Sequence, residues 1–301
     1  MTEFLQQLIN GLALGSIFAL IALGYTMVYG ILRFINFAHG DIFMLGAFAG
    51  FYLAPKIAAL VPLPSIIGAV IVLGASMAIC AALGVVIERL AYRPLRKQPK
   101  LTMLITAIGI SLFLEYTGQL IFGAAPQKFP EILPMMAIPK IGGLSFNSNQ
   151  IVVILVTLLL LIALRHIVLK TRIGTAMRAV SFNPEAAALM GVNTNVVISF
   201  TFALGSALAA AAGVLWSINY PAIDPLMGIL PGLKAFIAAV LGGIGNLPGA
   251  ALGGLVIGVV ETFVKGTRYS TWADAISFVI LILILLVKPS GLMGKKEIEK
   301  V

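Results

Sequence analysis

The chain has 301 residues, of which 60% are apolar and only 10% are charged, with a net charge of +9 and a mean hydropathy of +1.08. Soluble domains carry roughly 25% charged residues, so this composition excludes an ordinary soluble enzyme. The apolar residues fall in successive stretches of about 17–25, the length that crosses roughly 30 Å of hydrocarbon as a helix. We therefore expect an all-α, polytopic transmembrane helical bundle that forms one domain over residues 1–301.

Composition excludes several other classes of protein. A β-barrel would show segments of about 10 residues with alternating polarity, whereas residues 151–164 and 276–287 are apolar on every face. The single cysteine, Cys80, lies in an apolar run, so thiols cannot supply a disulfide, zinc or iron–sulfur framework. Basic residues in a membrane protein mostly report topology, and no basic stripe is interleaved with exposed aromatics, so we expect no nucleic-acid partner.

The first apolar run has no basic region before it and is too long for a signal-peptide core, so it is expected to stay as a helix. Glycine-rich breaks at 29–37 and 243–248 permit re-entrant or broken helices, so the expected count is eight to ten membrane segments. The apolar pattern predicts crossings at 4–29, 37–54, 65–88, 101–122, 151–169, 196–217, 227–243, 248–264 and 275–288.

The basic residues predict the orientation of the bundle. If the segments after Glu88, Leu169 and Lys288 share one side, that side holds 14 of the 20 Lys and Arg residues. The opposite side holds 5, and Lys234 remains inside an apolar run. By the positive-inside rule the first side is cytoplasmic, which places the C-terminus inside; nine crossings would place the N-terminus outside. The 14 residues are Arg33, Arg89, Arg93, Arg96, Lys97, Lys100, Arg165, Lys170, Arg172, Arg178, Lys288, Lys295, Lys296 and Lys300.

The longest external connection, residues 123–150, is rich in proline. Its prolines oppose regular helix and stiffen an extended path, so we expect a shaped surface rather than a flexible tether. Two interpretations of this surface stay open: a plain connecting loop, and a docking surface for an external partner. The prolines are Pro126, Pro130, Pro134 and Pro139.

No motif for catalysis occurs in the chain. A Gly-x-x-x-x-Gly-Lys-Ser/Thr phosphate loop is absent, so this chain is not expected to hydrolyse ATP by that route. The two histidines, His39 near a cytoplasmic boundary and His166 at a helix end, have no Ser or Cys nucleophile motif beside them. We therefore expect no catalytic residue, no bound cofactor and no metal site.

Charged residues inside the crossings mark candidate positions on a translocation pathway. Asp41 and Glu88 are expected near the cytoplasmic edge, which leaves Glu115 in the outer half of its crossing, in a structural ion pair or a snorkelling contact. Lys234 could pair with a substrate carboxylate or line a pore, but its four-carbon stem favours snorkelling. Asn36 and Asn219 are polar groups at helix ends that suit a pathway mouth, although turns alone would account for them. The candidate pathway residues are Asn36, Glu115, Asn219 and Lys234.

The cytoplasmic segment 170–195 contains a short helix with signals at both ends. Asn183 is a good N-cap, Pro184 suits the first helical position, Glu185 favours the positive end of the helix, and Gly191 can supply a left-handed stop. This pattern predicts a separate two-turn helix over 184–190, about 10 Å long. Leu189 and Met190 are its largest apolar groups. A short capped helix with apolar side chains on the cytoplasmic face suits the transmission of force from a soluble motor. The candidate coupling residues are Asn183, Pro184, Glu185, Ala186, Ala187, Leu189, Met190 and Gly191.

The run Glu185-Ala186-Ala187 followed by Gly191 resembles the cytoplasmic EAA-type loop through which ABC importer permeases engage their ATPases. Further stretches resemble the LivH-type permeases of high-affinity branched-chain amino-acid importers, over nearly the whole chain. They are Asn10–Gly24, Ile35–Asp41, Glu88-Arg89 with Tyr92–Arg96, Gly174–Gly191 and Lys234–Gly245.

The resemblance implies a multi-pass permease subunit of a bacterial inner membrane that moves leucine, isoleucine and valine without modifying them. It further implies two ATP-binding subunits, a second related permease and an external solute-binding protein. Urea or short-chain amide permeases share much of the pattern and give an alternative substrate. An ion-coupled amino-acid carrier that works alone is an alternative from another class, and a non-transporting membrane scaffold is a third.

Overall fold

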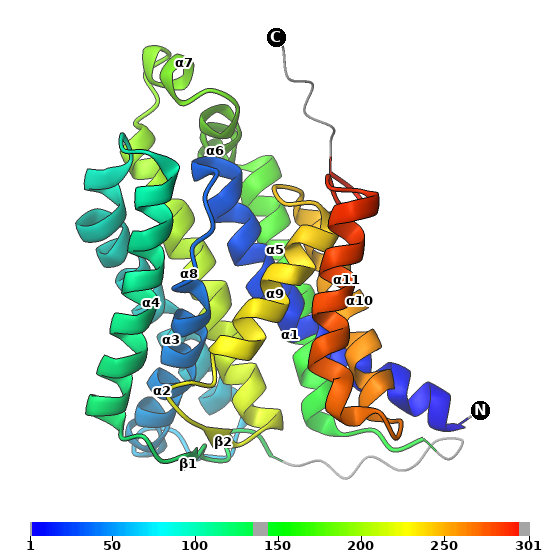
Figure 1. Cartoon of the computed structure of the whole chain (residues 1–301). Helices are drawn as coiled ribbons and strands as arrows, with labels where there is room; N and C mark the ends of the chain where they lie inside the picture. Colours follow the sequence, from blue (N-terminus) through cyan, green and yellow to red (C-terminus); the bar gives the residue numbers. More distant parts are fainter. Residues whose placement is uncertain (1, 135–143, 295–301) are drawn as a thin grey trace.

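The computed structural model describes residues 2–134 and 144–294, and these residues form a helical bundle (Figure 1). A turn of π-helix (Glu88–Tyr92) and a 3₁₀ turn (Arg93–Leu95) extend α3, and a second 3₁₀ turn (Ser270–Trp272) precedes α11. The helices are α1 (Thr2–Leu32), α2 (His39–Ala58), α3 (Ile66–Ile87), α4 (Lys100–Phe122), α5 (Ser148–Lys170), α6 (Arg172–Phe182), α7 (Pro184–Leu189), α8 (Thr194–Asn219), α9 (Ile229–Gly242), α10 (Leu247–Lys265) and α11 (Ala273–Val287). The prediction of an all-α polytopic bundle is confirmed.

Eight helical segments in the described part of the chain are long and apolar enough to cross a membrane. The segment predicted at 227–243 is helix α9, and its 14 residues, about 21 Å at 1.5 Å per residue, are too few for a full crossing, in agreement with the broken helix that the glycine-rich break at 243–248 permits. A non-helical segment that includes strand β2 (Ala222–Ile223) joins α8 to α9. This chain therefore uses a shortened helix at that crossing, a form that is tolerated where the backbone lies inside protein.

The two ends of the described chain lie at opposite ends of the bundle. Figure 1 shows α7 at the same end as the C-terminal side of α11, whereas Thr2 lies at the other end. The segments that follow α3, α5 and α11 share the α7 end, as the charge argument requires. Lys140, Lys295, Lys296 and Lys300 belong to that argument but lie outside the described residues.

Helix α1 is the centre of the bundle, since nearly all of its apolar stretch is buried. It packs closely on α10 because glycines remove the side chains that would separate the two backbones. A Cβ on Gly15 would lie 2.7 Å from Leu255 Cα, and a Cβ on Gly258 would lie 2.2 Å from Gly15 Cα. Small residues at membrane helix interfaces permit this close approach.

Helix α2 begins inside the bundle and not at its edge. Residues 33–38, between α1 and α2, are not helical, and the ring of His39 then lies against Gly24 of α1 and Gly205 near the middle of α8. The expectation that His39 and Asp41 lie at the cytoplasmic boundary is therefore wrong. Hydropathy could not show this, because it locates an apolar run but not the depth at which a broken helix resumes.

The proline-rich connection is packed onto the bundle where the structure describes it. Strand β1 (Gln127–Lys128) pairs antiparallel with β2, with Gln127 opposite Ile223. Phe129 and Ile132 are buried, and Ile132 accepts a backbone hydrogen bond from Ser65. Residues 127–134 therefore form a shaped surface, as expected, whereas Pro139 lies outside the described residues.

Candidate functional site

The short helix predicted in the cytoplasmic segment is α7, and its N-terminus is capped as expected. The Asn183 side-chain oxygen accepts hydrogen bonds from the backbone N–H groups of Glu185 and Ala186, both at 3.0 Å. Pro184 occupies the first position, where its missing N–H costs nothing. The cap thus satisfies two of the amide donors that a free helix start leaves open.

Gly191 ends α7 in the left-handed conformation, with a φ of 84°. The Gly191 N–H bonds to the Ala188 carbonyl and the Val192 N–H to the Ala187 carbonyl, both at 3.0 Å. This pair of bonds is the Schellman arrangement, which requires a left-handed residue at the turn. Nothing lies within 4 Å of the position a Cβ on Gly191 would take, so only backbone conformation restricts this site.

The outer surface of α7 is apolar and exposed. Leu189 is 89% exposed and Met190 is 85% exposed, as predicted for the side chains that contact a partner. Phe182, which precedes the Asn183 cap, is 90% exposed, and sequence reasoning missed it. Its position directly before an N-cap was the signal that could have found it. Ala187 faces inward and is buried, and Figure 1 shows α7 projecting beyond the ends of the membrane helices.

Helix α6, which was not predicted, holds α7 at a fixed place relative to α5. Thr171 caps α6 by accepting a hydrogen bond from the Gly174 N–H at 3.1 Å. A Cβ on Gly174 would lie 2.2 Å from the Ile167 carbonyl oxygen, so α6 lies directly on the end of α5. The Arg178 guanidinium donates to the Val168 carbonyl, which would otherwise be an open acceptor at the end of α5.

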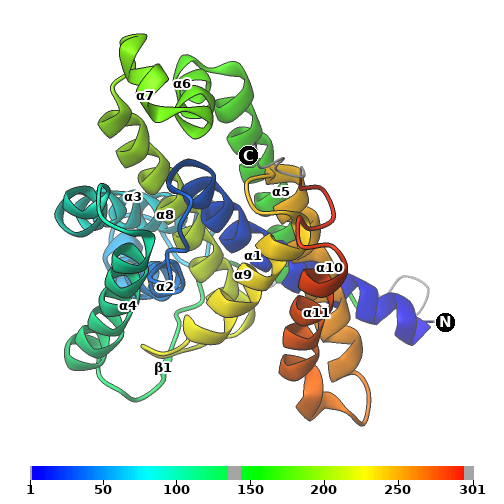
Figure 2. The same cartoon turned by 45° about the horizontal axis from the view of Figure 1, so that its top comes forward.

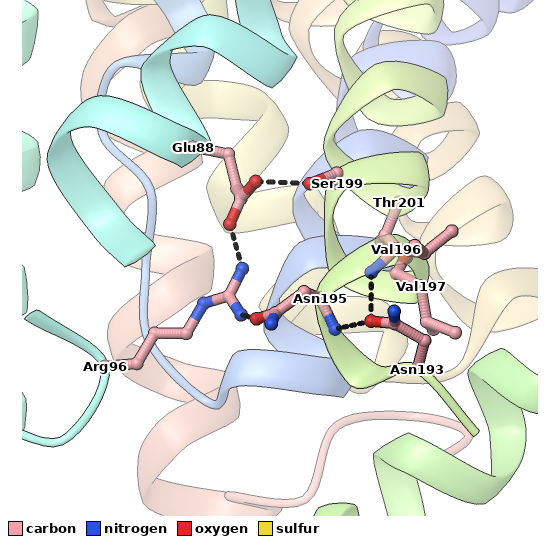
Figure 3. Close-up of polar contacts among 8 residues, drawn as sticks. All are labelled: Glu88, Arg96, Asn193, Asn195, Val196, Val197, Ser199 and Thr201. Atoms are coloured by element: carbon pink, nitrogen blue, oxygen red, sulfur yellow. Dashed lines mark hydrogen bonds and ion pairs between the residues drawn. The ribbon is translucent and has the colours of Figure 1, made fainter. Parts of the chain in front are cut away.

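A buried polar cluster joins the start of α8, the helix that follows α7, to the end of α3 (Figure 3). The Glu88 carboxylate is fully buried; it pairs with the Arg96 guanidinium and accepts a hydrogen bond from the Ser199 hydroxyl at 2.5 Å. Arg96 also donates to the Asn195 side chain at 2.8 Å. Burial lowers the pKa of Arg96 to about 10, so its guanidinium remains charged at neutral pH. Sequence reasoning placed Glu88 at the edge of the membrane and did not predict this cluster, although Glu88 and Arg96 both lie in stretches that carry the family resemblance.

The structure places Glu115 beside a second carboxylate. The Ser111 hydroxyl donates to Asp41 at 2.5 Å, and its oxygen lies 3.5 Å from a Glu115 carboxylate oxygen. Ser111 is near the middle of α4, so both acids lie within the span. Glu115 is therefore not the only acid inside a crossing, and among the described residues its contact is a hydroxyl that it shares with Asp41 and not the expected ion pair.

The expectation that Lys234 snorkels is wrong. Lys234 is 5% exposed, and its ammonium lies 2.7 Å from Glu261 of α10 and 2.6 Å from Asp274 of α11. Glu261 is also buried and pairs with Lys265 at 2.6 Å. Because two carboxylates are available from neighbouring helices, the charge of Lys234 is neutralised where it lies and its stem does not need to reach water.

The other two pathway candidates also have local partners. Asn36 is buried and accepts a 2.6 Å hydrogen bond from the Tyr92 hydroxyl, which attaches the 33–38 segment to the end of α3. Asn219 ends α8 and contacts the Leu215 carbonyl at 3.5 Å. The four candidates thus have four different sets of partners, and the structure does not bring them into one site.

The family described as the branched-chain amino acid transport system permease component matches residues 7–285. The permease protein BraD of Pseudomonas aeruginosa is 43% identical over 99% of this chain and 98% of its own length. The permease protein LivH of Escherichia coli K12 is 42% identical with the same coverage. Among solved structures, PsaBC from Streptococcus pneumoniae in complex with Fab gives a TM-score of 0.44 at 13% identity, covering 95% of this chain and 92% of that one. The sequence relatives have one assignment in common: the chain belongs to the family of branched-chain amino acid transport system permease components.

Proposed function

We propose that this chain is the permease subunit of an ATP-driven importer that moves leucine, isoleucine and valine into the cytoplasm. The observation that carries the proposal is α7, a helix capped at both ends whose apolar side chains project from one end of a membrane bundle. Such a surface is unfavourable in water, and a docked ATPase would cover it. Membership in the permease family supports the substrate, since BraD and LivH are named as high-affinity branched-chain amino acid permeases.

The proposed partners are two ATP-binding subunits, a second related permease and an external solute-binding protein, in a bacterial inner membrane with the C-terminus cytoplasmic. In this assembly α7 lies in a groove of the ATPase, and α6 and the α8 start transmit its movement. The contacts of Glu88 and Arg96 across α3 and α8 support this route, because they join α8 to the membrane part by charged hydrogen bonds.

Reconstitution of the whole importer in proteoliposomes tests the substrate and the energy source together. We expect accumulation of radiolabelled leucine, isoleucine and valine that requires internal ATP and the binding protein and does not require a cation gradient. Urea or acetamide accumulation in place of leucine would transfer the proposal to the amide permeases. Accumulation by this chain alone under a proton or sodium gradient would identify an ion-coupled carrier and contradict the ATP-driven mechanism.

The two carboxylates on Ser111 give a second test of the ion-coupled alternative. In an ATP-driven importer, Asp41→Asn and Glu115→Gln keep hydrogen-bonding groups at the same places and remove only charge. We expect uptake by both variants to keep its ATP dependence and its pH profile. A lost or shifted pH profile in either variant would show that proton binding at this pair is part of transport, contrary to the proposal.

The contact itself is tested by Leu189→Asp, with Leu60→Asp as the matched control. Leu60 is 84% exposed and follows α2 at the opposite end of the bundle, so the two substitutions differ in place and not in chemistry. We expect Leu189→Asp to lose co-purification of the ATPase and Leu60→Asp to retain it. Normal recovery of the ATPase with both variants would remove α7 from the mechanism.

A further inference from the structure

A cavity of about 1060 Å³ opens at the α7 end of the bundle and has no role in the proposed transport cycle. Helices α5 and α6 supply one wall, α9, α10 and α11 supply the other, and the end of α1 lies between them. Figure 2 brings this end of the molecule forward. Four of the membrane helices contribute residues near their α7 ends: Met27 in α1, Val168 in α5, Val240 in α9 and Leu285 in α11.

The cavity combines an apolar interior with a cationic rim. Its interior is lined by Met27, Val168, Phe236, Val240, Leu281 and Leu285. Arg33, Lys100 and Arg178 also line it, and all three side chains are exposed. No Asp or Glu of the described residues is among the lining residues. Among the described lining residues the charged side chains are thus all cationic, and they lie beside a surface that suits hydrocarbon.

Two of these cations are restrained by their surroundings, Arg33 through its backbone and Arg178 through its side chain. Arg33 adopts a left-handed conformation with a φ of 52°, which L-residues with a Cβ avoid unless the surrounding structure holds them there. Arg178 is held against the end of α5 by its bonds to the Val168 carbonyl and to the Thr175 hydroxyl. These two bonds leave further guanidinium N–H donors of Arg178 for an anion, since a guanidinium carries five.

We propose that this cavity binds an anionic phospholipid, with its phosphate between Arg33, Arg178 and Lys100 and its acyl chains along the apolar wall. An amino-acid substrate fits less well, because its ammonium group would find no carboxylate among the described lining residues. An anionic lipid supplies both the negative charge and the hydrocarbon, and basic pockets between membrane helices on the cytoplasmic side suit such headgroups. The proposal depends on the proposed function only for assigning this end to the cytoplasmic leaflet.

Native mass spectrometry of the detergent-purified chain tests the proposal. The protein is titrated with dioleoylphosphatidylglycerol and, in parallel, with dioleoylphosphatidylcholine. We expect preferential retention of phosphatidylglycerol, weakened about tenfold in Arg33→Gln/Arg178→Gln because two cations near the headgroup are lost. The control Lys56→Gln/Lys128→Gln removes two exposed cations from the opposite end, and it should bind like the unaltered chain.

Replacing Arg178 could also disturb the packing of α6 on α5, so a second variant tests the cavity without replacing Arg178. Ser181→Glu adds a negative charge to the cavity wall and removes the Ser181 hydroxyl bond to the Arg178 carbonyl, but it leaves the guanidinium bonds of Arg178 to Val168 and Thr175 in place, so it should also weaken retention of phosphatidylglycerol. Equal retention by the unaltered chain and both cavity variants would overturn the proposal, as would equal retention of the two lipids. Displacement of the lipid by inorganic phosphate would indicate a site for free anions instead.

The assembled importer provides the last comparison. Loss of phosphatidylglycerol on assembly with the ATPase would show that a subunit contact fills the cavity and would overturn the lipid assignment. Lipid retention is measured without ATP or substrate, so a failure of the uptake experiment leaves this result unchanged.

Discussion

Helix α7 and the ion cluster around Lys234 are stabilised in opposite ways. The hydrogen bonds that cap both ends of α7 join residues between Asn183 and Val192, and its apolar tip is exposed. The partners of Lys234 lie 27 and 40 residues further along the chain, in α10 and α11, and the ammonium is buried. Helix α7 is thus a locally stabilised structure that exposes an apolar surface. The cluster around Lys234 is a buried tertiary contact that holds three helices together.

The difference predicts where substitutions affect stability and where they affect partners. Breaking a buried ion pair leaves an uncompensated charge in a medium of low dielectric constant, which costs stability directly. Changing an exposed side chain leaves the bundle folded, because no buried contact is lost. Substitutions at Lys234 should therefore lower the free energy of unfolding, and substitutions in α7 should leave a stable protein that fails to bind its partner.

Lys234→Met should have the largest effect on folding. It leaves Glu261 buried with one remaining partner, Lys265, and we expect a loss of about 3–5 kcal/mol in the free energy of unfolding. Lys265→Met is the matched control, because Lys265 pairs with the same carboxylate but is half exposed. The control should cost less than about 1 kcal/mol. Unfolding in mixed detergent micelles measures both, and equal losses would contradict the importance of burial.

Arg96→Gln should have the next largest effect, because it removes the cationic partner of the fully buried Glu88 carboxylate and leaves the hydrogen bond from Ser199. We expect a loss of about 2 kcal/mol or more, since removing one member of a buried charged pair leaves the other unpaired. The pair Arg96→Gln/Glu88→Gln removes both charges and should recover most of that loss. A double-mutant cycle on unfolding free energies measures the coupling. Additive losses would show that the two groups do not interact.

Gly191→Val should change α7 alone. A β-branched residue in the left-handed conformation costs roughly 1–2 kcal/mol, and it would disfavour the turn that ends the helix. We expect the unfolding midpoint of the bundle to be unchanged and the co-purification of the ATPase to fall. Gly123→Val is the control, because Gly123 also has a positive φ with open space around it but ends α4 at the other end. Equal ATPase recovery with both variants would contradict the coupling role.

The sequence was sufficient for the features that depend on neighbouring residues. The long apolar runs predicted α1, α3, α4, α5 and α8 to within a few residues, and capping rules predicted both ends of α7. The sequence was insufficient for features that depend on how deep a residue lies in the bundle or on which residue of another helix it contacts. Lys234, Asp41 and Glu88 have ordinary side chains in apolar runs, and their partners come from other helices. The glycine-rich break at 29–37 marked the interruption before α2, but hydropathy averages over a window, so it cannot give the depth in the bundle at which α2 resumes.

Single cysteine substitutions should have the smallest effect on stability, and labelling them tests the orientation of the bundle in the membrane. Ser145→Cys and Met190→Cys, made in a Cys80→Ala background, place thiols at exposed positions at opposite ends of the bundle. Neither replaces a buried side chain, so unfolding should change by less than about 0.5 kcal/mol relative to the Cys80→Ala chain. With α7 in the cytoplasm, a membrane-impermeant maleimide added to intact cells should label Ser145→Cys and leave Met190→Cys unlabelled until the membrane is opened. The reverse pattern would place α7 outside, where no ATP-driven motor could reach it, and the positive-inside argument would fail together with the coupling proposal.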